Sequence, residues 1–255
     1  MERPGYHYSS RPTRNPFRYL HAVWRLLRND PSQEIDAAAT VELGFVNTRL
    51  GRRFARWEQV IAALKADPRT APSMSARKAF GPIVLADLEG LPEGTLGRVF
   101  ADHCRARNLD PNLVYMEPTD EVGWLLNHLY QTHDIWHVFT GWGNDLAGEV
   151  GLGGFYCAQL AAPPFFGYML SLVVMNVIMR RANLQEVLEA FSVGYEMGQR
   201  AEPLWGSDWD ALWDVPIEEL RTRFEVDRTR IVGEGVRAAA SSSRARDRVI
   251  VAGGG

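Results

Sequence analysis

The sequence has few cysteines and no long uninterrupted apolar run. Its 255 residues include two cysteines, Cys104 and Cys157, which lie far apart and form no CxxC pattern. This usage is typical of a reducing compartment and argues against a disulfide framework. The longest nearly uncharged run, residues 146–179, is interrupted by Glu149 and by a Pro-Pro pair. The apolar segment after the prolines is shorter than the ~20 apolar residues that a membrane span needs.

The chain also lacks an excess of positive charge. Its 28 Lys and Arg residues are outnumbered by 31 Asp and Glu residues, which gives a formal net charge of −3 at pH 7. We therefore expect no nucleic acid as a partner, because proteins that bind it present a net basic surface. No secretory signal is visible. The short N-terminus carries Arg and Ser but also Glu2, which favours a disordered arm over an organelle-targeting peptide.

What the chain does have is helical periodicity. Hydrophobic residues make up 46% of the sequence, a normal share for a globular core. Apolar residues recur at helical spacing, and no segment shows the alternation of a strand. We predict a single-domain all-α helical bundle over residues 16–226, between a disordered arm (1–15) and a disordered tail (227–255). The predicted helices cover about residues 16–30, 34–67, 96–108, 121–139, 144–160, 165–181, 183–201 and 217–224.

Most of the candidate chemistry lies in the stretch HDIWHVFTGWGNDLAGE, residues 133–149. At about 100° per residue, a helix places His137 near 40° and Asp134 near 100° from His133. These three potential ligands share an arc that is polar for one turn on an otherwise apolar side. His128 points roughly the opposite way, which favours a structural role for it.

A further carboxylate lies on the next predicted helix. The segment TGWGN ends the first helix, and Asn144 is a candidate N-cap for the second. On that second helix Glu149 is aligned with an apolar stripe, where an unpaired carboxylate would be unfavourable. We therefore expect Glu149 to face His133 and His137 and to share a divalent cation with them.

A simpler interpretation is that the histidine pair is polar by chance on a partly exposed helix. The contiguous Asp134 and the inward-facing Glu149 favour a metal centre between the two adjacent helices. Nitrogen and oxygen ligands without sulfur suit Zn²⁺ first, Fe²⁺ or Mn²⁺ next, and leave Mg²⁺ open.

Glycines cluster on the second of these helices, where each costs up to ~1 kcal/mol relative to Ala. Gly148, Gly151 and Gly154 group on the side away from the carboxylate, where we expect a neighbouring helix to approach closely. Gly153 lies on the carboxylate side together with Tyr156, and there we predict contacts with a substrate.

Two other predicted helices have apolar surfaces that could meet a lipid. The helix at residues 165–181 is apolar on nearly all sides and rich in Met and aromatic residues. Such a pattern suits either a buried core helix or a lipid-lined pocket. The helix at residues 16–30 is amphipathic, with Arg residues flanking its apolar face, and suits docking on the core or on a membrane surface.

HDIWH followed by eleven residues and Glu149 resembles the His-Asp-x-x-His-x11-Glu signature of the Coq-four family of ubiquinone biosynthesis. Three other segments resemble the same family, and the similarity covers about residues 40–226: LKADPRTAPSMSARKAF, LEGLPEGTLGRVFADHCRARNLDP and YEMGQRAEPLWGSDWDALWDVPIEELRTRF. The resemblance implies an all-helical fold and a metal held by His133, Asp134, His137 and Glu149 as the catalytic residues.

The resemblance further implies a lyase that decarboxylates a polyprenylated 4-hydroxybenzoate oxidatively at ring carbon 1, replacing the carboxyl group with hydroxyl. Zinc has no redox chemistry, so either oxygen reacts with the electron-rich ring itself or iron is the working metal. One alternative is a non-catalytic lipid-binding scaffold that organises the ubiquinone-biosynthetic complex. Another is a metal-dependent phosphohydrolase of the His-Asp type that uses His103 and Asp208, although no phosphate cradle surrounds the doublet.

Partners and location are also implied by the resemblance. The expected partners are a polyprenyl-hydroxybenzoate lipid, the membrane surface and other ubiquinone-biosynthesis proteins, and a homodimer is open. The expected location is peripheral, on the cytoplasmic face of a bacterial membrane or the matrix face of the mitochondrial inner membrane.

Overall fold

The computed structural model describes residues 8–9, 16–28, 57–78, 80–115, 118–160 and 183–233. Across these ranges the chain is built of helices, which confirms the all-α prediction. A two-residue strand, β1 (Tyr8–Ser9), pairs in parallel with β2 (Val114–Tyr115). The helices are α1 (Pro16–Arg28), α3 (Trp57–Ala66), α4 (Ala71–Ala76), α5 (Leu85–Glu89), α6 (Leu96–Arg107), α7 (Glu121–Thr140), α8 (Leu146–Leu160), α10 (Leu184–Arg200) and α11 (Ile217–Arg223), with a 3-10 turn η1 (Trp209–Ala211).

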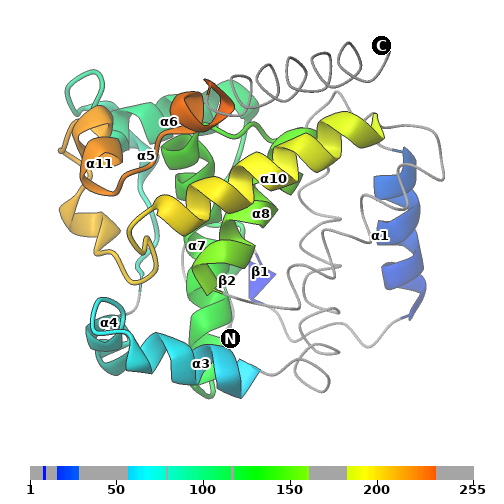
Figure 1. The fold of residues 1–255 in the computed structure, drawn as a ribbon, viewed down its shortest axis with the longest axis horizontal. Helices are drawn as coiled ribbons and strands as arrows, with labels where there is room; N and C mark the ends of the chain where they lie inside the picture. Colours follow the sequence, from blue (N-terminus) through cyan, green and yellow to red (C-terminus); the bar gives the residue numbers. More distant parts are fainter. Residues whose placement is uncertain are drawn as a thin grey trace, which may run out of the picture.

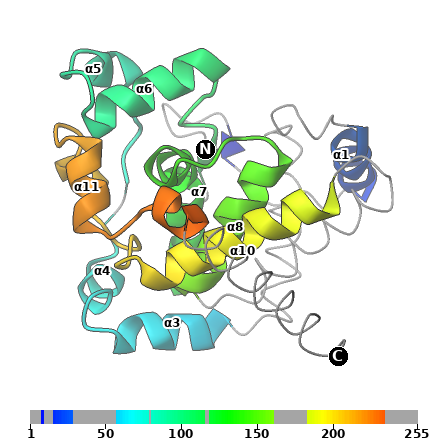
Figure 2. The ribbon, with the colours of Figure 1, turned by 45° about the horizontal axis from the view of Figure 1, so that its top comes forward.

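Helix α7 is the central element of the bundle. In Figures 1 and 2 it runs through the interior, with α6, α8, α10 and α11 arranged around it and α1 at one edge. It packs against α3, α6, α8 and α11, while α8 and α10 form the most extensive helix pair. Because neighbours cover α7 on several sides, a side chain on almost any of its faces is buried.

Both ends of α7 are fixed by specific backbone partners. At its start the Asp120 carboxylate accepts the backbone N–H of Gly123 at 2.7 Å, which caps the first turn. At its end Gly141 adopts a left-handed conformation with φ of 74°, and its N–H donates to the carbonyl of His137. The boundary of α7 is therefore set one turn beyond the histidine pair.

The last carbonyls of α7 are bound by two arginines from the C-terminal part of the chain. The Arg221 guanidinium donates to the carbonyls of Val138 at 2.8 Å and Phe139 at 2.9 Å. Arg228 donates to the carbonyl of Gly141 at 2.8 Å, and its guanidinium carbon lies 3.8 Å from the ring centroid of Trp142. Cations at this end satisfy unpaired carbonyls and complement the helix dipole.

Glycines bring α8 and α10 into close contact. A methyl group on Gly154 would clash with the carbonyl of Phe191, and one on Gly194 would clash with the backbone of Gly151. This confirms the predicted close approach at Gly151 and Gly154. Gly148 differs, because its near neighbour is the backbone of Gly143 in the preceding loop and not a helix.

Several sequence predictions fall outside the described residues. The predicted helix at 34–67 is seen from Trp57 onward, and the predicted apolar helix at 165–181 lies wholly outside. Within the predicted arm (1–15) the structure describes β1, and within the predicted tail (227–255) it describes a helical turn at residues 228–233. The domain boundaries at residues 16 and 226 stay predictions. Among the helices that the structure describes, none has the length and hydropathy needed to cross a membrane.

Candidate metal centre

Helices α7 and α8 bring His133, His137 and Glu149 together. The Nε2 atoms of the two histidines lie 3.1 Å apart. The Glu149 carboxylate lies 3.2 Å from Nε2 of His137 and 3.5 Å from Nε2 of His133. One ligand atom from each residue falls within 4.8 Å of the other two, a spacing that a single metal ion can bridge. The predicted convergence of these three residues is therefore present.

The other ring nitrogen of each histidine also has a partner. Nδ1 of His137 lies 3.2 Å from the carbonyl oxygen of Trp142. A carbonyl can only accept a hydrogen bond, so this contact places the hydrogen of neutral His137 on Nδ1 and leaves a lone pair on Nε2. Nδ1 of His133 lies 3.4 Å from the Tyr156 hydroxyl, which can accept a hydrogen in the same way. Partners that fix the tautomer in this manner are typical of metal-binding histidines.

The centre is enclosed on one side and accessible on the other. The side chain of His137 is fully buried and that of Glu149 is 12% exposed, whereas that of His133 is 35% exposed. A ligand from outside would therefore approach past His133. Three protein ligands with one accessible side are typical of catalytic metal sites, whereas structural sites are closed by four.

The electrostatics couple the histidines to the carboxylate. Burial alone would lower the pKa of His133, but the hydrogen bond and negative charge of Glu149 outweigh it and raise that pKa. Burial alone would raise the pKa of Glu149, but the charge of His137 and hydrogen bonds from both histidines lower it well below its ordinary value. Protonated His133 and ionised Glu149 thus stabilise each other in the cluster, and a cation could take the place of that proton.

Asp134 does not lie in this group of three. Its half-buried side chain comes one residue after His133, so the helix turns it about 100° away from its neighbour. Burial raises the pKa of Asp134, the two histidines lower it, and Glu149 and Asp110 raise it further, so the pKa is raised overall. Its carboxylate therefore interacts with the centre electrostatically from outside the group.

Tyr156 packs directly against the metal-centre residues. Its ring is stacked 4.3 Å from Trp136 and 5.9 Å from His133, measured between ring centroids. Burial raises the pKa of Tyr156 well above its ordinary value, so the phenol stays neutral. The predicted partner Gly153 is buried within α8. Tyr156 thus supports His133 from within the protein, and its predicted contact with a substrate stays a prediction.

The loop between the two helices differs from expectation at its cap. Asp145, and not Asn144, caps α8, because its carboxylate accepts the N–H of Gly148 at 2.7 Å. Asn and Asp are both favourable N-cap residues, so the sequence pattern could not predict which of the two begins the helix. The contact between the Trp142 carbonyl and His137 was also not predicted from the sequence, because every residue has a backbone carbonyl and residue type does not show which one accepts.

The residues expected for a phosphohydrolase are not assembled. His103 lies on α6 with its Nδ1 3.2 Å from the guanidinium of Arg107. Asp208 pairs with Lys78 at 2.5 Å. In the part of the chain that the structure describes, neither belongs to the histidine–carboxylate group.

The chain is similar to known proteins of ubiquinone biosynthesis. A family model described as coenzyme Q (ubiquinone) biosynthesis protein Coq4 matches residues 50–230. The mitochondrial ubiquinone biosynthesis protein COQ4 homolog of Rattus norvegicus is 25% identical over 171 residues, which are 64% of this chain and 63% of that protein. The Bos taurus homolog is 22% identical over 181 residues, 68% of this chain and 66% of that protein. The chain thus spans less than two thirds of the length of each of these relatives.

A solved structure has the same fold. The crystal structure of a candidate ubiquinone biosynthesis protein from Nostoc punctiforme is 28% identical in sequence and superimposes with a TM-score of 0.65. The match covers 84% of this chain and 100% of that one.

Proposed function

The chain belongs to the coenzyme Q (ubiquinone) biosynthesis protein Coq4 family, which is involved in ubiquinone biosynthesis, and we propose that it acts there as a metal-dependent enzyme. The proposed reaction is the oxidative decarboxylation of a polyprenylated 4-hydroxybenzoate at ring carbon 1. The bond between the ring and its carboxyl carbon breaks, carbon dioxide leaves, and hydroxyl takes its place. The net change withdraws two electrons, so an oxidant of the dioxygen class is consumed.

One observation carries this proposal: three ligand atoms converge with one side accessible. His133, His137 and Glu149 would hold the metal, while the Trp142 carbonyl and Tyr156 orient the histidines. A divalent metal bound there would polarise the ring carboxylate or a neighbouring phenol oxygen and stabilise the charge that develops as carbon dioxide leaves. We propose that Asp134, which lies outside the group of three, contacts the substrate beside the metal.

The ligand set also bears on the identity of the metal. Two histidines and one carboxylate form zinc sites in hydrolases, and the same set forms iron sites in oxygenases. Because the proposed reaction withdraws electrons and zinc has no redox chemistry, we propose Fe²⁺ for turnover and retain Zn²⁺ as an ion that can occupy the centre.

The N-terminal helix supports peripheral attachment to a membrane. Phe17, Leu20 and Trp24 lie on one face of α1 and are 78%, 60% and 52% exposed. The guanidinium carbon of Arg28 lies 4.8 Å from the ring centroid of Trp24. Aromatic and aliphatic residues beside arginines suit insertion at an anionic lipid surface. We propose that this face meets the bacterial or mitochondrial membrane in which the polyprenyl substrate resides, near other ubiquinone-biosynthesis proteins.

The proposed reaction can be tested with purified full-length protein and a short-chain prenylated 4-hydroxybenzoate. Metal-free protein is loaded with Fe²⁺, Zn²⁺ or Mn²⁺, and the products are measured by mass spectrometry. The proposal expects loss of carbon dioxide and gain of hydroxyl with Fe²⁺, and no turnover by the Glu149→Ala protein. Stoichiometric metal binding without turnover with any of these metals would favour the scaffold role instead.

A further inference from the structure

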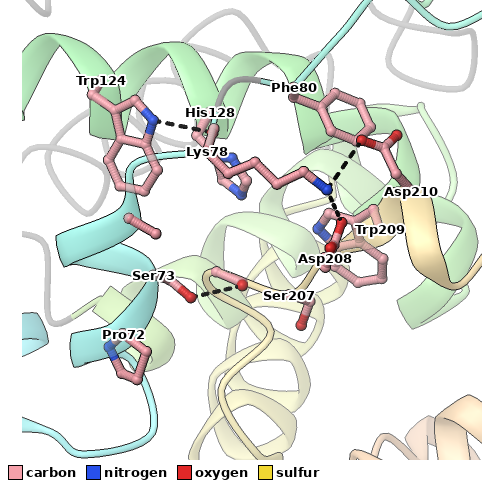
Figure 3. Close-up of a pocket in the computed structure, with 12 residues that line it drawn as sticks. Pro72, Ser73, Lys78, Phe80, Trp124, His128, Ser207, Asp208, Trp209 and Asp210 are labelled. Carbon is pink, nitrogen blue, oxygen red and sulfur yellow. Dashed lines mark hydrogen bonds and ion pairs between the residues drawn. The ribbon is translucent and has the colours of Figure 1, made fainter.

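A second pocket lies on the face of α7 that points away from the metal centre. His128 lies five residues before His133, which places the two side chains about 140° apart around the helix. The pocket has a volume of about 230 Å³ and is formed by α7, residues 72–78 together with Phe80, and the loop around η1. Figure 3 shows its lining, which consists of Pro72, Ser73, Ala76, Lys78, Phe80, Trp124, His128, Gly206, Ser207, Asp208, Trp209 and Asp210.

The volume and walls of the pocket fit a single aromatic ring. An apolar cavity of about 150 Å³ is large enough to bind benzene, so about 230 Å³ accommodates a ring with a substituent. Trp124, His128 and Trp209 form much of the wall and are buried. His128 is stacked on Trp124 at 5.6 Å and meets the Trp205 ring edge-on at 4.6 Å, both between ring centroids. The wall is therefore preorganised by packing.

Three buried nitrogen atoms at this pocket have no hydrogen-bond partner within the described part of the chain. They are Nδ1 and Nε2 of His128, which is 7% exposed, and Nε1 of Trp209, which is fully buried. Figure 3 shows His128 projecting from α7 into the space between Lys78 and Ser73, with the indole nitrogen of Trp209 turned toward it. Unpaired buried polar groups are unfavourable and call for a bound partner.

The protonation state of His128 decides what that partner must offer. Burial lowers the pKa of His128 to about 4, so the ring is neutral at pH 7. A neutral imidazole has one N–H donor and one bare nitrogen acceptor, and an indole has one N–H donor. One hydroxyl group accepts from an N–H and donates to a bare nitrogen, so it can pair with the Trp209 N–H and with one ring nitrogen of His128.

The charges at the mouth of the pocket favour a neutral ligand. The ammonium group of Lys78 lies 2.5 Å from a carboxylate oxygen of Asp208 and 3.7 Å from one of Asp210. All three side chains are about half exposed, and the Lys78 stem crosses the pocket in Figure 3. Because two carboxylates outnumber one ammonium, an anionic ligand is repelled, and the one cation is already paired.

We propose that this pocket binds one neutral phenolic ring, with its hydroxyl group directed at His128 and Trp209. The ring could belong to a free small phenol or to a tyrosine side chain of another protein, since both present the same chemistry. The proposal is independent of the metal centre and of the reaction proposed there.

The probe for the test is 4-methylphenol, titrated into full-length protein while the indole N–H signals are followed by NMR. We expect saturable one-to-one binding that shifts a buried indole signal. Toluene, which has the same shape without the hydroxyl, should bind about two- to tenfold more weakly, the effect of one neutral hydrogen bond. The His137→Ala protein should bind 4-methylphenol as well as wild type, which separates this site from the metal centre.

Variants locate the binding and make the outcome decisive. Ala76→Trp places a large side chain at the exposed rim and should abolish binding, whereas Ser75→Trp on the same helix turn lies outside the lining and should not. His128→Phe keeps the aromatic wall and should remove the preference for 4-methylphenol over toluene. Equal binding by the Ala76→Trp and Ser75→Trp proteins, or no saturable binding by wild type, would overturn the proposal.

A third probe separates the two sources of the ring. N-acetyl-tyrosinamide carries the same phenol on a peptide backbone. Binding as tight as that of 4-methylphenol would support a tyrosine of a partner protein as the occupant. Binding of 4-methylphenol alone would support a small phenol.

Discussion

The carbonyl oxygen of Trp142 lies 3.2 Å from Nδ1 of His137 and thereby determines which nitrogen of that histidine faces Glu149. This contact links the histidine–carboxylate group to the C-terminal part of the chain, because Arg228 lies over the Trp142 ring and binds the neighbouring carbonyl of Gly141. His137 on α7 is thus connected through Trp142 to Arg228, which lies some ninety positions later in the chain. We expect variants of the histidine–carboxylate group to change metal content and pH dependence, and variants of the surrounding helices to change the free energy of unfolding.

Replacing Asp134 should separate metal binding from turnover. Its carboxylate lies outside the group of three ligands but interacts with it electrostatically. Asp134→Asn should therefore keep most of its metal while losing turnover of the prenylated hydroxybenzoate. Metal content per chain and product formation are measured on the same sample, with Asp102→Asn, an exposed site on α6, as the control. An Asp134→Asn protein with wild-type turnover would remove this residue from the proposed active site.

The stability of the metal-free protein should depend on pH on both sides of an optimum. The pKa of Glu149 is lowered from an ordinary value of 4.5, so its contribution is present above pH 4.5 and is lost as the pH falls through the lowered pKa. The pKa of His133 is raised from an ordinary value of 6.5, so its contribution is present below pH 6.5 and is lost as the pH rises through the raised pKa. These two contributions to the free energy of unfolding are therefore greatest together between pH 4.5 and 6.5.

Thermal unfolding of metal-free wild type from pH 4.5 to well above pH 6.5, compared with Glu149→Gln, measures the effect. The difference between the two proteins should shrink as the pH rises above 6.5 through the raised pKa of His133. Metal affinity should change in the opposite sense and rise over the same range, because the metal then no longer competes with that proton. A difference in stability that is constant across the range would contradict the coupling of His133 to Glu149.

The α8–α10 contact should not tolerate a side chain at its glycines. Gly194→Ala would place a methyl group against the backbone of Gly151, which cannot move aside as a flexible side chain can. Overpacking of this kind costs about 1–3 kcal/mol or more. Gly81→Ala is the matched control, since nothing lies within 4 Å of the added methyl group. Urea unfolding compares the two; equal stability would show that the helices are further apart than the structure has them.

The arginine at the end of α7 should contribute measurably to stability. Arg221→Ala removes the donors to the carbonyls of Val138 and Phe139. Hydrogen bonds to a charged group contribute about 1.5–3 kcal/mol each, and partial exposure of Arg221 places the expected loss at the lower end. Arg223→Ala, whose exposed side chain contacts the Phe224 ring, should change the free energy of unfolding by less than about 0.5 kcal/mol. Similar losses for both variants would contradict the capping role.

The histidine–carboxylate group was largely predictable because its three residues follow helical spacing. His133 and His137 are one turn apart, and Glu149 is the carboxylate in an apolar stripe of the next helix, so local periodicity brings all three to one interface. Asp134 is part of the same motif, yet the helix turns it away from the group. Residue type alone cannot show which of two neighbouring residues faces the group when both, like His133 and Asp134, are possible metal ligands.

The features that the sequence could not predict depend on backbone atoms and distant contacts. The Trp142 carbonyl is a backbone group, which every residue has, so the sequence does not single it out. The hydrogen bonds from Arg221 and Arg228 join residues that lie more than eighty positions apart in the chain. His128 was interpreted as structural from its angle on the helix; it packs between Trp124 and Trp205, and its two unpaired ring nitrogens are the basis of the binding role that we propose for it. The pocket beside it arises from three separate segments, which periodicity along one helix does not reveal.

The central claim is that His133, His137 and Glu149 hold one divalent metal, and metal content per chain tests it most directly. Wild type, His137→Ala, Glu149→Ala and the control His128→Phe are purified under the same conditions and analysed by mass spectrometry for iron, zinc and manganese. We expect about one metal per chain in wild type and in His128→Phe, and a loss of most of it in the two ligand variants. Equal metal content in all four proteins would contradict the assignment.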